Sequence, residues 1–246
     1  RHRLRLAEMR DRILTVQFGG AAGTLAALED RGLDVMVALG EELDLPVPVM
    51  HWHAQRDGLV ELGSWFGNVA GSLGKIGQDA VLLAQSEVGE LRERAGADGP
   101  RGGSSTMPQK ANPISGEALI AVAREAAGLV GALHQSQIQE HERGSPGWTL
   151  EWQVLPRLAI ATAAATRHAG GLIDRMDPQV DRMRANLGSD GLILAEAASF
   201  ALARHMPRPE AQALVKTIAM DVAKTGGNLF DRLKSEVDAP VDWAHV

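Results

Sequence analysis

Apolar residues recur in steps of three and four over four long stretches of the chain. This spacing predicts amphipathic helices, because it places the apolar side chains on one face of an α-helix. The four seams are Leu6, Met9, Ile13, Val16, Gly20, Gly23 and Ala27; Leu59, Leu62, Phe66, Val69, Leu73, Ile76, Ala80 and Leu83; Leu119, Val122, Ala126, Leu129 and Leu133; and Leu155, Leu158, Thr162, Ala165, Ala169 and Leu172. Helices of about 25 residues would each span roughly 37 Å. Long helices with small seam residues predict an antiparallel bundle that associates with further copies of itself.

Shorter elements follow after Met176, as a series of helix starts and breaks indicates: Asp177-Pro178, Gly188, Gly191, Pro207 and Pro209. No alternating strand pattern of useful length occurs, apart from a brief stretch at 46–49. We therefore predict an all-α fold. It has a central long-helix bundle domain over 1–176, which contains a loop at 94–113, and a small C-terminal helical domain over 177–246.

Composition excludes several classes of function. The net charge of −6 comes from scattered signs without a basic stripe, which argues against a nucleic-acid partner. The chain has no cysteine, so disulfides and thiolate metal sites are excluded, and a reducing cytoplasm fits. No apolar run approaches the roughly 18 residues that a membrane span needs.

The loop at 94–113 is rich in Gly, Pro and Ser, and connections of this length are either functional or disordered. It ends in Gly-Ser-Ser-Thr-Met-Pro-Gln-Lys-Ala-Asn-Pro, residues 103–113. Asn112 followed by Pro113 predicts a helix start, with Asn at the N-cap and Pro at the first helical position. Free N–H groups at a helix start favour an anion. Together with Ser104, Ser105 and Lys110, they predict a carboxylate site.

Such a cluster suits one kind of chemistry. Removing a proton from a carbon beside a carboxylate leaves a doubly negative enediolate, so fixed donors must stand where that charge appears. The helix start, Lys110 and Asn112 supply donors. A serine hydroxyl is a poor base in water and needs help from nearby positive charge or another base.

This run resembles the signature loop of the fumarase/aspartase superfamily, Gly-Ser-Ser-x-Met-Pro-x-Lys-x-Asn-Pro, and every fixed position is present. The resemblance implies that Ser104 exchanges the proton, with Ser105 as a neighbouring donor, and that Lys110 and Asn112 hold the substrate. The first apolar seam begins at Leu6, close to the first residue, and neither an N-cap residue nor an initiator Met precedes it. We therefore expect the chain to lack an N-terminal portion, which in this family carries a helical domain and further site residues.

Other stretches look like the 3-carboxy-cis,cis-muconate cycloisomerase branch of that superfamily: 16–24, 52–57, 139–143 with Trp148 and Glu151-Trp152, 183–187 and 191–196. Adenylosuccinate lyases share the His-Glu-Arg step but follow it with serines and an arginine that hold a phosphate. Here Trp148, Thr149 and Trp152 stand in that region, and an indole cannot clamp a phosphate as a guanidinium does. The departure favours a smaller, purely carboxylate substrate. At Ala111, relatives often have a basic residue, so the loop's positive field is weaker here.

The resemblance also suggests that His141 contacts the substrate or donates a proton. The residues alone also allow a histidine at a helix C-terminus that interacts with the helix dipole. Arg143 is either a two-pronged partner of a substrate carboxylate or a solvated surface arginine.

Three residues of the Trp-His-Ala-Gln-Arg-Asp stretch, His53, Gln55 and Arg56, line the site by resemblance or cap the next helix. Glu117 either favours the helix start or, as the family suggests, orients a catalytic group. His51 and His53 are two residues apart and share no helix face, and no further ligand set follows, so no metal site is predicted.

The resemblance implies a cytoplasmic homotetramer whose active sites are shared between subunits and bind a small di- or tricarboxylate. The expected reaction is cycloisomerisation of 3-carboxy-cis,cis-muconate, or a close analogue, to a carboxymuconolactone in protocatechuate (β-ketoadipate) catabolism. It needs no metal or organic cofactor. Two alternatives remain: a fumarate-releasing lyase of the adenylosuccinate or argininosuccinate type, and a non-catalytic helical scaffold.

Overall fold

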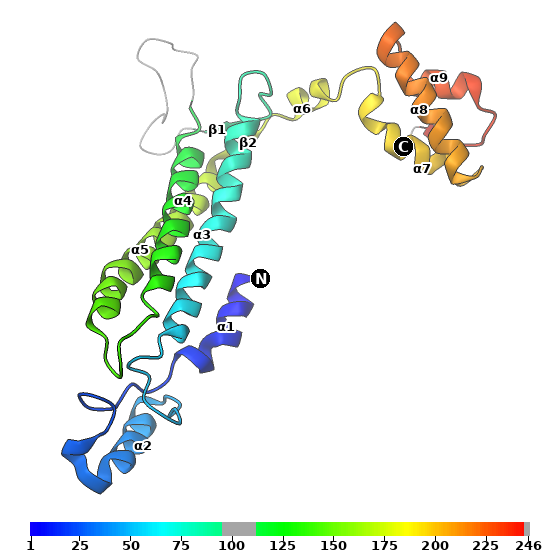
Figure 1. Cartoon of the computed structure of the whole chain (residues 1–246). Coiled ribbons are helices and arrows are strands. Elements are labelled where there is room, and N and C mark those ends of the chain that lie inside the picture. The colour runs from blue at the N-terminus through cyan, green and yellow to red at the C-terminus, as the bar shows by residue number, and fades with distance from the viewer. Residues whose placement is uncertain (95–111, 244–246) are drawn as a thin grey trace, which may run out of the picture. The chain divides into compact units, whose positions relative to one another are not determined.

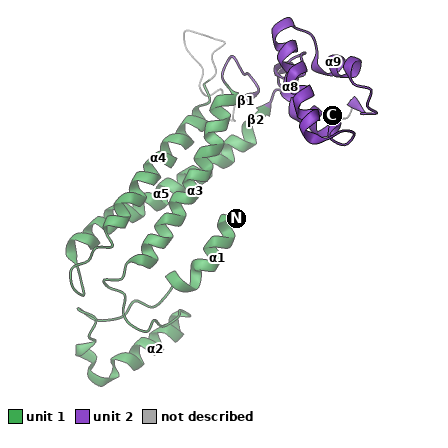
Figure 2. Cartoon of the chain, turned by 45° about the vertical axis from the view of Figure 1, so that its right-hand side comes forward, with its two compact units in different colours: residues 1–84, 93–177 green, residues 85–92, 178–246 purple. Residues whose placement is uncertain are grey.

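The computed structural model describes residues 1–94 and 112–243 and divides the chain into two compact units. The bundle unit comprises Arg1–Ala84 and Glu93–Asp177, and the C-terminal unit comprises Gln85–Arg92 and Pro178–Val246 (Figure 2). The predicted domain boundary after residue 176 stays a prediction. The predicted all-α class is confirmed, because the described chain is helical apart from loops and two short paired strands.

In chain order, the elements up to the second strand are α1 (His2–Ile13), the 3₁₀-helix η1 (Ala26–Arg31), α2 (Gly32–Leu43), α3 (Asp57–Leu83), β1 (Leu91–Glu93), α4 (Ile114–Gln135), α5 (Ser145–Arg175) and β2 (Met176–Pro178). Helices α3, α4 and α5 pack lengthwise against one another, and α1 packs on α3 (Figure 1). Within the described residues, no helix is long and apolar enough to cross a membrane.

The predicted seams of α4 and α5 are buried, including Leu119, Leu133, Leu158 and Leu172. The α3 seam is displaced from its predicted position. The large apolar side chains of that seam are only partly buried, and Ala80 is its one buried member. The other buried positions of α3 are Val60 and four small residues, Gly63, Ala70, Gly74 and Gly77. Small residues on this face let α4 approach α3 closely. In this part of the core, the two helix backbones pack against each other with few large side chains between them.

The two backbones come close together where Gly77 of α3 meets Gly116 of α4. A methyl group added to Gly77 would stand 2.7 Å from the carbonyl oxygen of Gly116, and one added to Gly116 would stand 2.9 Å from that of Gly77. Both distances are shorter than a van der Waals contact. The two backbones therefore fix the beginning of α4 against α3.

The first predicted seam, residues 6–27, is not one helix, and that prediction is wrong. Helix α1 ends at Ile13, and an irregular segment follows. Gly20 and Gly23 have φ angles of +68° and +84°, a conformation that L side chains rarely adopt. The two glycines match the apolar spacing only by coincidence. Their positive φ angles allow the chain to turn here. Helix α2, which the apolar pattern did not predict, follows this segment.

The start of α4 lies one residue later than predicted. Pro113 occupies the N-cap position with φ −79° and ψ 63°, and the Ile114 N–H donates to the Asn112 carbonyl at 2.9 Å. This is an inverse γ-turn, which keeps Pro113 out of the helical conformation. Asn112 is therefore tied by its backbone, not as a side-chain cap, to the first turn of α4.

The C-terminal unit contains α6 (Val180–Asn186), η2 (Leu192–Leu194), α7 (Ala195–Leu202), α8 (Arg208–Thr225) and α9 (Leu229–Glu236). Its core combines residues of α7, α8 and α9: Ala198, Leu202, Ala211, Val215, Ile218, Val222, Leu229 and Leu233. Asn228 caps α9 by accepting the N–H groups of Phe230 and Asp231. The Arg182 and Asn186 side chains donate to the Val88 carbonyl, which holds residues 85–92 in this unit.

We expect Gly77→Ala to lower the free energy of unfolding by about 1–3 kcal/mol, because the new methyl group overpacks against a backbone carbonyl. The control is Gly71→Ala on the same helix, where an added methyl group meets nothing within 4 Å. That change should stabilise by up to about 1 kcal/mol through helix propensity. Urea unfolding followed by tryptophan fluorescence measures both. Equal stability of the two variants would contradict the close packing.

Candidate active site

The predicted site residues that the structure describes lie at opposite ends of the bundle unit. The loop end comprises Glu93, residues 112–117 and Arg175, around the beginning of α4 (Figure 1). The histidine end comprises residues 17–23, 51–56 and 141–151, around the beginnings of α3 and α5. Helix α4 has 22 residues and separates the ends. Its length is roughly 33 Å at 1.5 Å per residue.

At the loop end, the predicted Ser104, Ser105 and Lys110 lie outside the described residues. Asn112 is half-buried, and Glu117 is exposed in the first turn of α4. The Glu117 carboxylate therefore stands near the positive end of the helix, as the helix-start alternative expects. The structure brings Asn112 and Glu117 to the same end of α4.

The histidine end is organised around a buried ion pair. Arg56 donates from Nε to Glu151 Oε2 at 2.8 Å and from Nη2 to Glu151 Oε1 at 2.6 Å, and both side chains are 6% exposed. Arg56 Nη1 also donates to the Trp52 carbonyl, and the guanidinium lies over the rings of Trp52 and Trp148. The positive charge of Arg56 is thus neutralised within the chain, which favours a positioning role over direct substrate binding.

The position of Glu151 in the sequence indicates a buried ion pair, although the apolar spacing of α5 did not reveal it. Glu151 stands three and seven residues before Val154 and Leu158, on the buried face of α5. A carboxylate in an apolar seam requires a partner, because burying an isolated charge is costly. The partner, Arg56, is 95 residues away in the chain.

His53 is 5% exposed and packs against His51, with 4.9 Å between ring centroids, and edge-on against Trp148 at 6.4 Å. Burial lowers the pKa of His53, and electrostatic interactions with His51, Arg143 and Arg56 lower it further. The imidazole is therefore neutral near pH 7 and offers one donor and one acceptor nitrogen. Its Nδ1, like Nε1 of Trp148, is buried and has no partner among the described residues.

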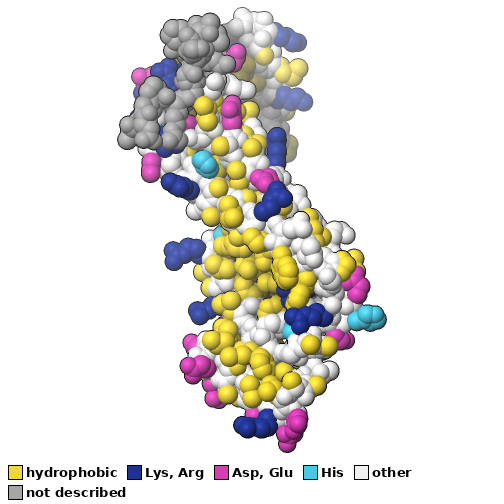
Figure 3. Space-filling model, turned by 90° about the vertical axis from the view of Figure 1, so that its left-hand side faces the viewer, with side chains coloured by type: hydrophobic (Ala, Val, Ile, Leu, Met, Phe, Trp, Pro, Cys, Tyr) yellow, Lys and Arg dark blue, Asp and Glu magenta, His cyan; other side chains and the backbone are white. Residues whose placement is uncertain are grey.

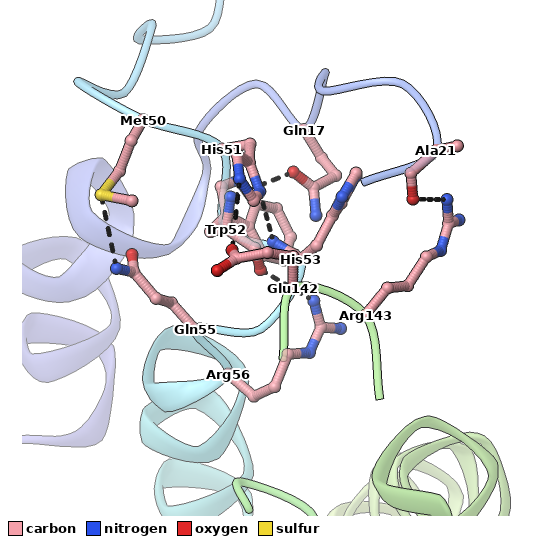
Figure 4. A network of polar contacts seen from close by, with 10 residues as sticks. All are labelled: Gln17, Ala21, Met50, His51, Trp52, His53, Gln55, Arg56, Glu142 and Arg143. Carbon is pink, nitrogen blue, oxygen red and sulfur yellow. Dashed lines mark hydrogen bonds and ion pairs between the residues drawn. The ribbon is translucent and has the colours of Figure 1, made fainter. Parts of the chain in front are cut away.

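Arg143 links the 141–148 segment to the segment that follows α1 (Figure 4). Its Nη1 donates to the carbonyls of Ala21 at 2.8 Å and Gly20 at 3.3 Å, and its guanidinium lies 4.5 Å from the Trp148 ring centroid. The side chain is exposed, yet it is held in place by these contacts. Neither predicted alternative included this backbone contact.

His141 does not lie at a helix C-terminus, so the helix-dipole alternative is wrong. Helix α4 ends at Gln135, and His141 occupies an exposed turn with a φ of +51°. The carboxylate of its neighbour Glu142 lies 3.7 Å from Nε2 of His51. His141 therefore belongs to the same end of the bundle unit as His53 and Arg143.

The segment with Gly19 and Gly23 closes on His51. A methyl group on Gly19 would stand 2.9 Å from Cβ of His51, and one on Gly23 would overlap the imidazole ring. Nearby, Trp52 Nε1 donates to the Val16 carbonyl at 3.0 Å. These contacts position His51 and His53. In the sequence, only the resemblance of residues 16–24 to the cycloisomerase branch indicated that this segment belongs to the site.

Gln55 is exposed and points away from this cluster, with its amide 3.6 Å from the sulfur of Met50. It lines a cavity of about 190 Å³ together with Arg12, Met50 and Trp52. Although Arg56 stands at the N-cap position of α3, no side chain caps that helix, so the capping alternative fails. Among residues 1–94 and 112–243, no three His, Asp or Glu side chains gather as a metal site would require.

We expect Glu151→Gln to cost about 3–5 kcal/mol of unfolding free energy, because it leaves the Arg56 charge buried and unpaired. Glu125→Gln is the control, since Glu125 pairs with Arg157 at the surface, where the two side chains are 51% and 63% exposed. Surface pairs contribute about 0–1 kcal/mol. Urea unfolding compares the variants, and a similarly small loss for both would mean that the buried pair is unimportant for stability.

Comparison with known proteins agrees with this architecture. A lyase family model matches residues 1–128. The chain is 54% identical over 217 residues to the 3-carboxy-cis,cis-muconate cycloisomerase of Pseudomonas aeruginosa, covering 88% of this chain and 47% of that protein. It is 42% identical to the protein of the same name from Bradyrhizobium diazoefficiens, covering 88% and 48%.

The crystal structure of the 3-carboxy-cis,cis-muconate lactonizing enzyme from Pseudomonas putida superposes with a TM-score of 0.81 at 41% identity, covering 96% of this chain and 51% of that one. The chain thus spans about half the length of the relatives that it matches. From the family match and these similarities, the chain belongs to the lyase family of the fumarase/aspartase superfamily, in its 3-carboxy-cis,cis-muconate cycloisomerase branch.

Proposed function

We propose that the protein to which this chain belongs is a cycloisomerase that interconverts 3-carboxy-cis,cis-muconate and a carboxymuconolactone in aromatic catabolism. The observation that carries the proposal is the similarity to the Pseudomonas aeruginosa cycloisomerase, which extends over both ends of the bundle unit. The replacement of phosphate-holding residues by Trp148, Thr149 and Trp152 supports a substrate whose only anionic groups are carboxylates.

In the proposed reaction, an oxygen of one substrate carboxylate bonds to a carbon of a C=C double bond, and the adjacent carbon receives a proton. In the reverse direction, Ser104 removes that proton and the lactone carboxylate leaves. Lys110, Asn112 and the start of α4 stabilise the enediolate that forms between these events. Atoms and electrons balance without an oxidant or a reductant, so the proposal includes no cofactor.

The histidine end provides groups for the remaining carboxylates. Arg143 supplies a cation, and His141 lies two residues from it, within reach of solvent. A neutral His53 can donate a hydrogen bond without adding a charge, because burial and neighbouring cations lower its pKa. Arg56 and Glu151 hold this group of side chains in place. At the loop end, Glu117 orients a catalytic group.

One chain cannot bring its two ends to one small substrate, because α4 keeps them roughly 33 Å apart. The proposed active site therefore combines the loop end of one copy with the histidine end of another. The proposed assembly is a homotetramer, and its proposed location is the cytoplasm. Exposed apolar side chains on α5, Trp152, Ile160 and Ile173, support association of copies. Hydrophobic side chains also gather on the face of the molecule that Figure 3 shows.

The substrate assay uses the full-length protein with 3-carboxymuconate, adenylosuccinate and argininosuccinate in parallel. We expect turnover of the muconate alone, and a loss of roughly 10²-fold or more for Ser104→Ala, because the proton-exchanging group is removed. Turnover of a succinyl substrate alone would identify a fumarate-releasing lyase. A folded wild-type protein that turns over none of the three would favour a helical scaffold.

Mixing two inactive variants tests the shared site. When Ser104→Ala and Arg143→Ala subunits reassemble together, we expect about a quarter of the sites to combine two intact ends. Activity should recover in that proportion. The control mixes Ser104→Ala with Lys110→Ala, both of the loop end, and should recover nothing. Absence of recovery in the first mixture, with mixed oligomers present, would place both ends of each site in one subunit.

A further inference from the structure

Three side chains from separate segments meet at the loop end of the bundle unit. Ser115 Oγ donates to Glu93 Oε1 at 2.5 Å, and Arg175 Nε donates to the same oxygen at 3.0 Å. Arg175 Nη2 completes the triangle by donating to Ser115 Oγ at 3.0 Å, and it lies 2.9 Å from Glu93 Oε1. The serine hydroxyl is therefore both donor and acceptor.

Water has little access to this triangle. Ser115 is 4% exposed, and the side chains of Glu93 and Arg175 are 10% and 22% exposed. The exposed pair of Arg157 and Glu125 makes a single contact at 3.1 Å. Hydrogen bonds between charged groups are roughly twice as strong as neutral ones, and limited solvent strengthens them further. The triangle is thus a firm connection, unlike the surface ion pair of Arg157 and Glu125, which joins the same two helices, α5 and α4.

The triangle joins three elements. Glu93 ends β1, Ser115 lies in the first turn of α4, and Arg175 ends α5. Backbone contacts reinforce it, because the Arg94 N–H donates to the Arg175 carbonyl at 2.9 Å. The next residue along α4, Gly116, meets the backbone of Gly77. The first turn of α4 is thus held from two directions.

This turn carries residues of the proposed site. Asn112 is joined to it by the γ-turn at Pro113, and Glu117 follows Ser115 by two residues. We propose that Arg175 is a positioning residue, which holds Glu93 and Ser115 so that Asn112 and the first turn of α4 meet the developing enediolate. The inference rests on the proposed function, because it requires that Asn112 binds the activated carboxylate.

The guanidinium is the group that this geometry needs. Its planar fork places one N–H on the carboxylate and another on the hydroxyl, which a single ammonium cannot match in direction. Misplacement of a donor by about 1 Å can cost 10²-fold in rate. Because the enediolate charge exists only beyond the ground state, the loss should appear in kcat more than in KM.

The test compares Arg175→Ala with Arg157→Ala, an exposed arginine on the same helix, in the full-length protein. We expect kcat with 3-carboxymuconate to fall about 10²-fold in Arg175→Ala, with KM little changed, and to stay near wild type in Arg157→Ala. Added guanidinium ion should restore part of the kcat of Arg175→Ala, whereas equal concentrations of sodium or urea should not. Wild-type kcat in Arg175→Ala would overturn the proposal.

Two milder variants serve if Arg175→Ala does not fold. Arg175→Lys keeps the charge, and Ser115→Ala removes only the hydroxyl, so both should lower kcat by a smaller factor than the alanine change. Normal kcat in both would overturn the inference.

Amide hydrogen exchange separates this inference from the proposed function, because it needs no turnover. Exchange at residues 114–118 should be faster in the Arg175 variants than in Arg157→Ala, with α8 and α9 unchanged. If wild-type protein lacks muconate turnover but this exchange difference appears, the proposed function fails while the positioning role of Arg175 stands. Unchanged exchange at 114–118 would show that Arg175 does not hold the first turn of α4.

Discussion

The two-pronged contact between Arg56 and Glu151 holds the beginning of α3 to the beginning of α5, and the histidine end depends on it. With both charges satisfied by each other, the guanidinium can stack on Trp52 and Trp148 at a buried position. The indole of Trp148 in turn supports Arg143 and the edge of His53. One buried ion pair thus sets the positions of an aromatic ring, a cation and a neutral imidazole.

The second constraint is the length of α4. A continuous helix of 22 residues is rigid, so the groups at its two ends cannot approach each other within one subunit. The bundle therefore offers two half-sites, each held firmly by its own network. At the loop end the network consists of Glu93, Ser115 and Arg175, and at the histidine end it is centred on Arg56 and Glu151. Association is then a requirement of the proposed chemistry rather than an addition to it.

The long helices could be predicted from sequence because apolar spacing reports directly on helix faces, as Leu119 and Leu158 show. Glycine defeats this reasoning in two ways. At Gly77 it marks a close contact between two helix backbones although it carries no hydrophobic signal, and at Gly20 it coincides with the apolar spacing although its positive φ does not fit an α-helix.

The site shows a similar division between local and long-range information. A contiguous motif indicated Asn112, and resemblance indicated His53 and Arg143. Glu151 in the apolar seam of α5 indicates that a buried partner exists, but a single sequence does not identify Arg56, 95 residues away, as that partner. The pair of Glu93 and Arg175 leaves no pattern at all, because each is an ordinary charged residue on its own. The roles of Ser104, Ser105 and Lys110 stay predictions, since these residues lie outside the described part of the chain.

The side chain of Arg143 contacts only main-chain atoms of Gly20 and Ala21, their carbonyl oxygens. A main-chain carbonyl is the same acceptor whatever side chain follows, and Ala21 and Ala22 are both exposed. Substitutions at Ala21 and Ala22 can therefore change the side chains beside the Arg143 guanidinium while the backbone of the segment keeps its course. In the proposed site, exchange of these small side chains would change the groups that border the carboxylate bound by Arg143, without moving the guanidinium itself.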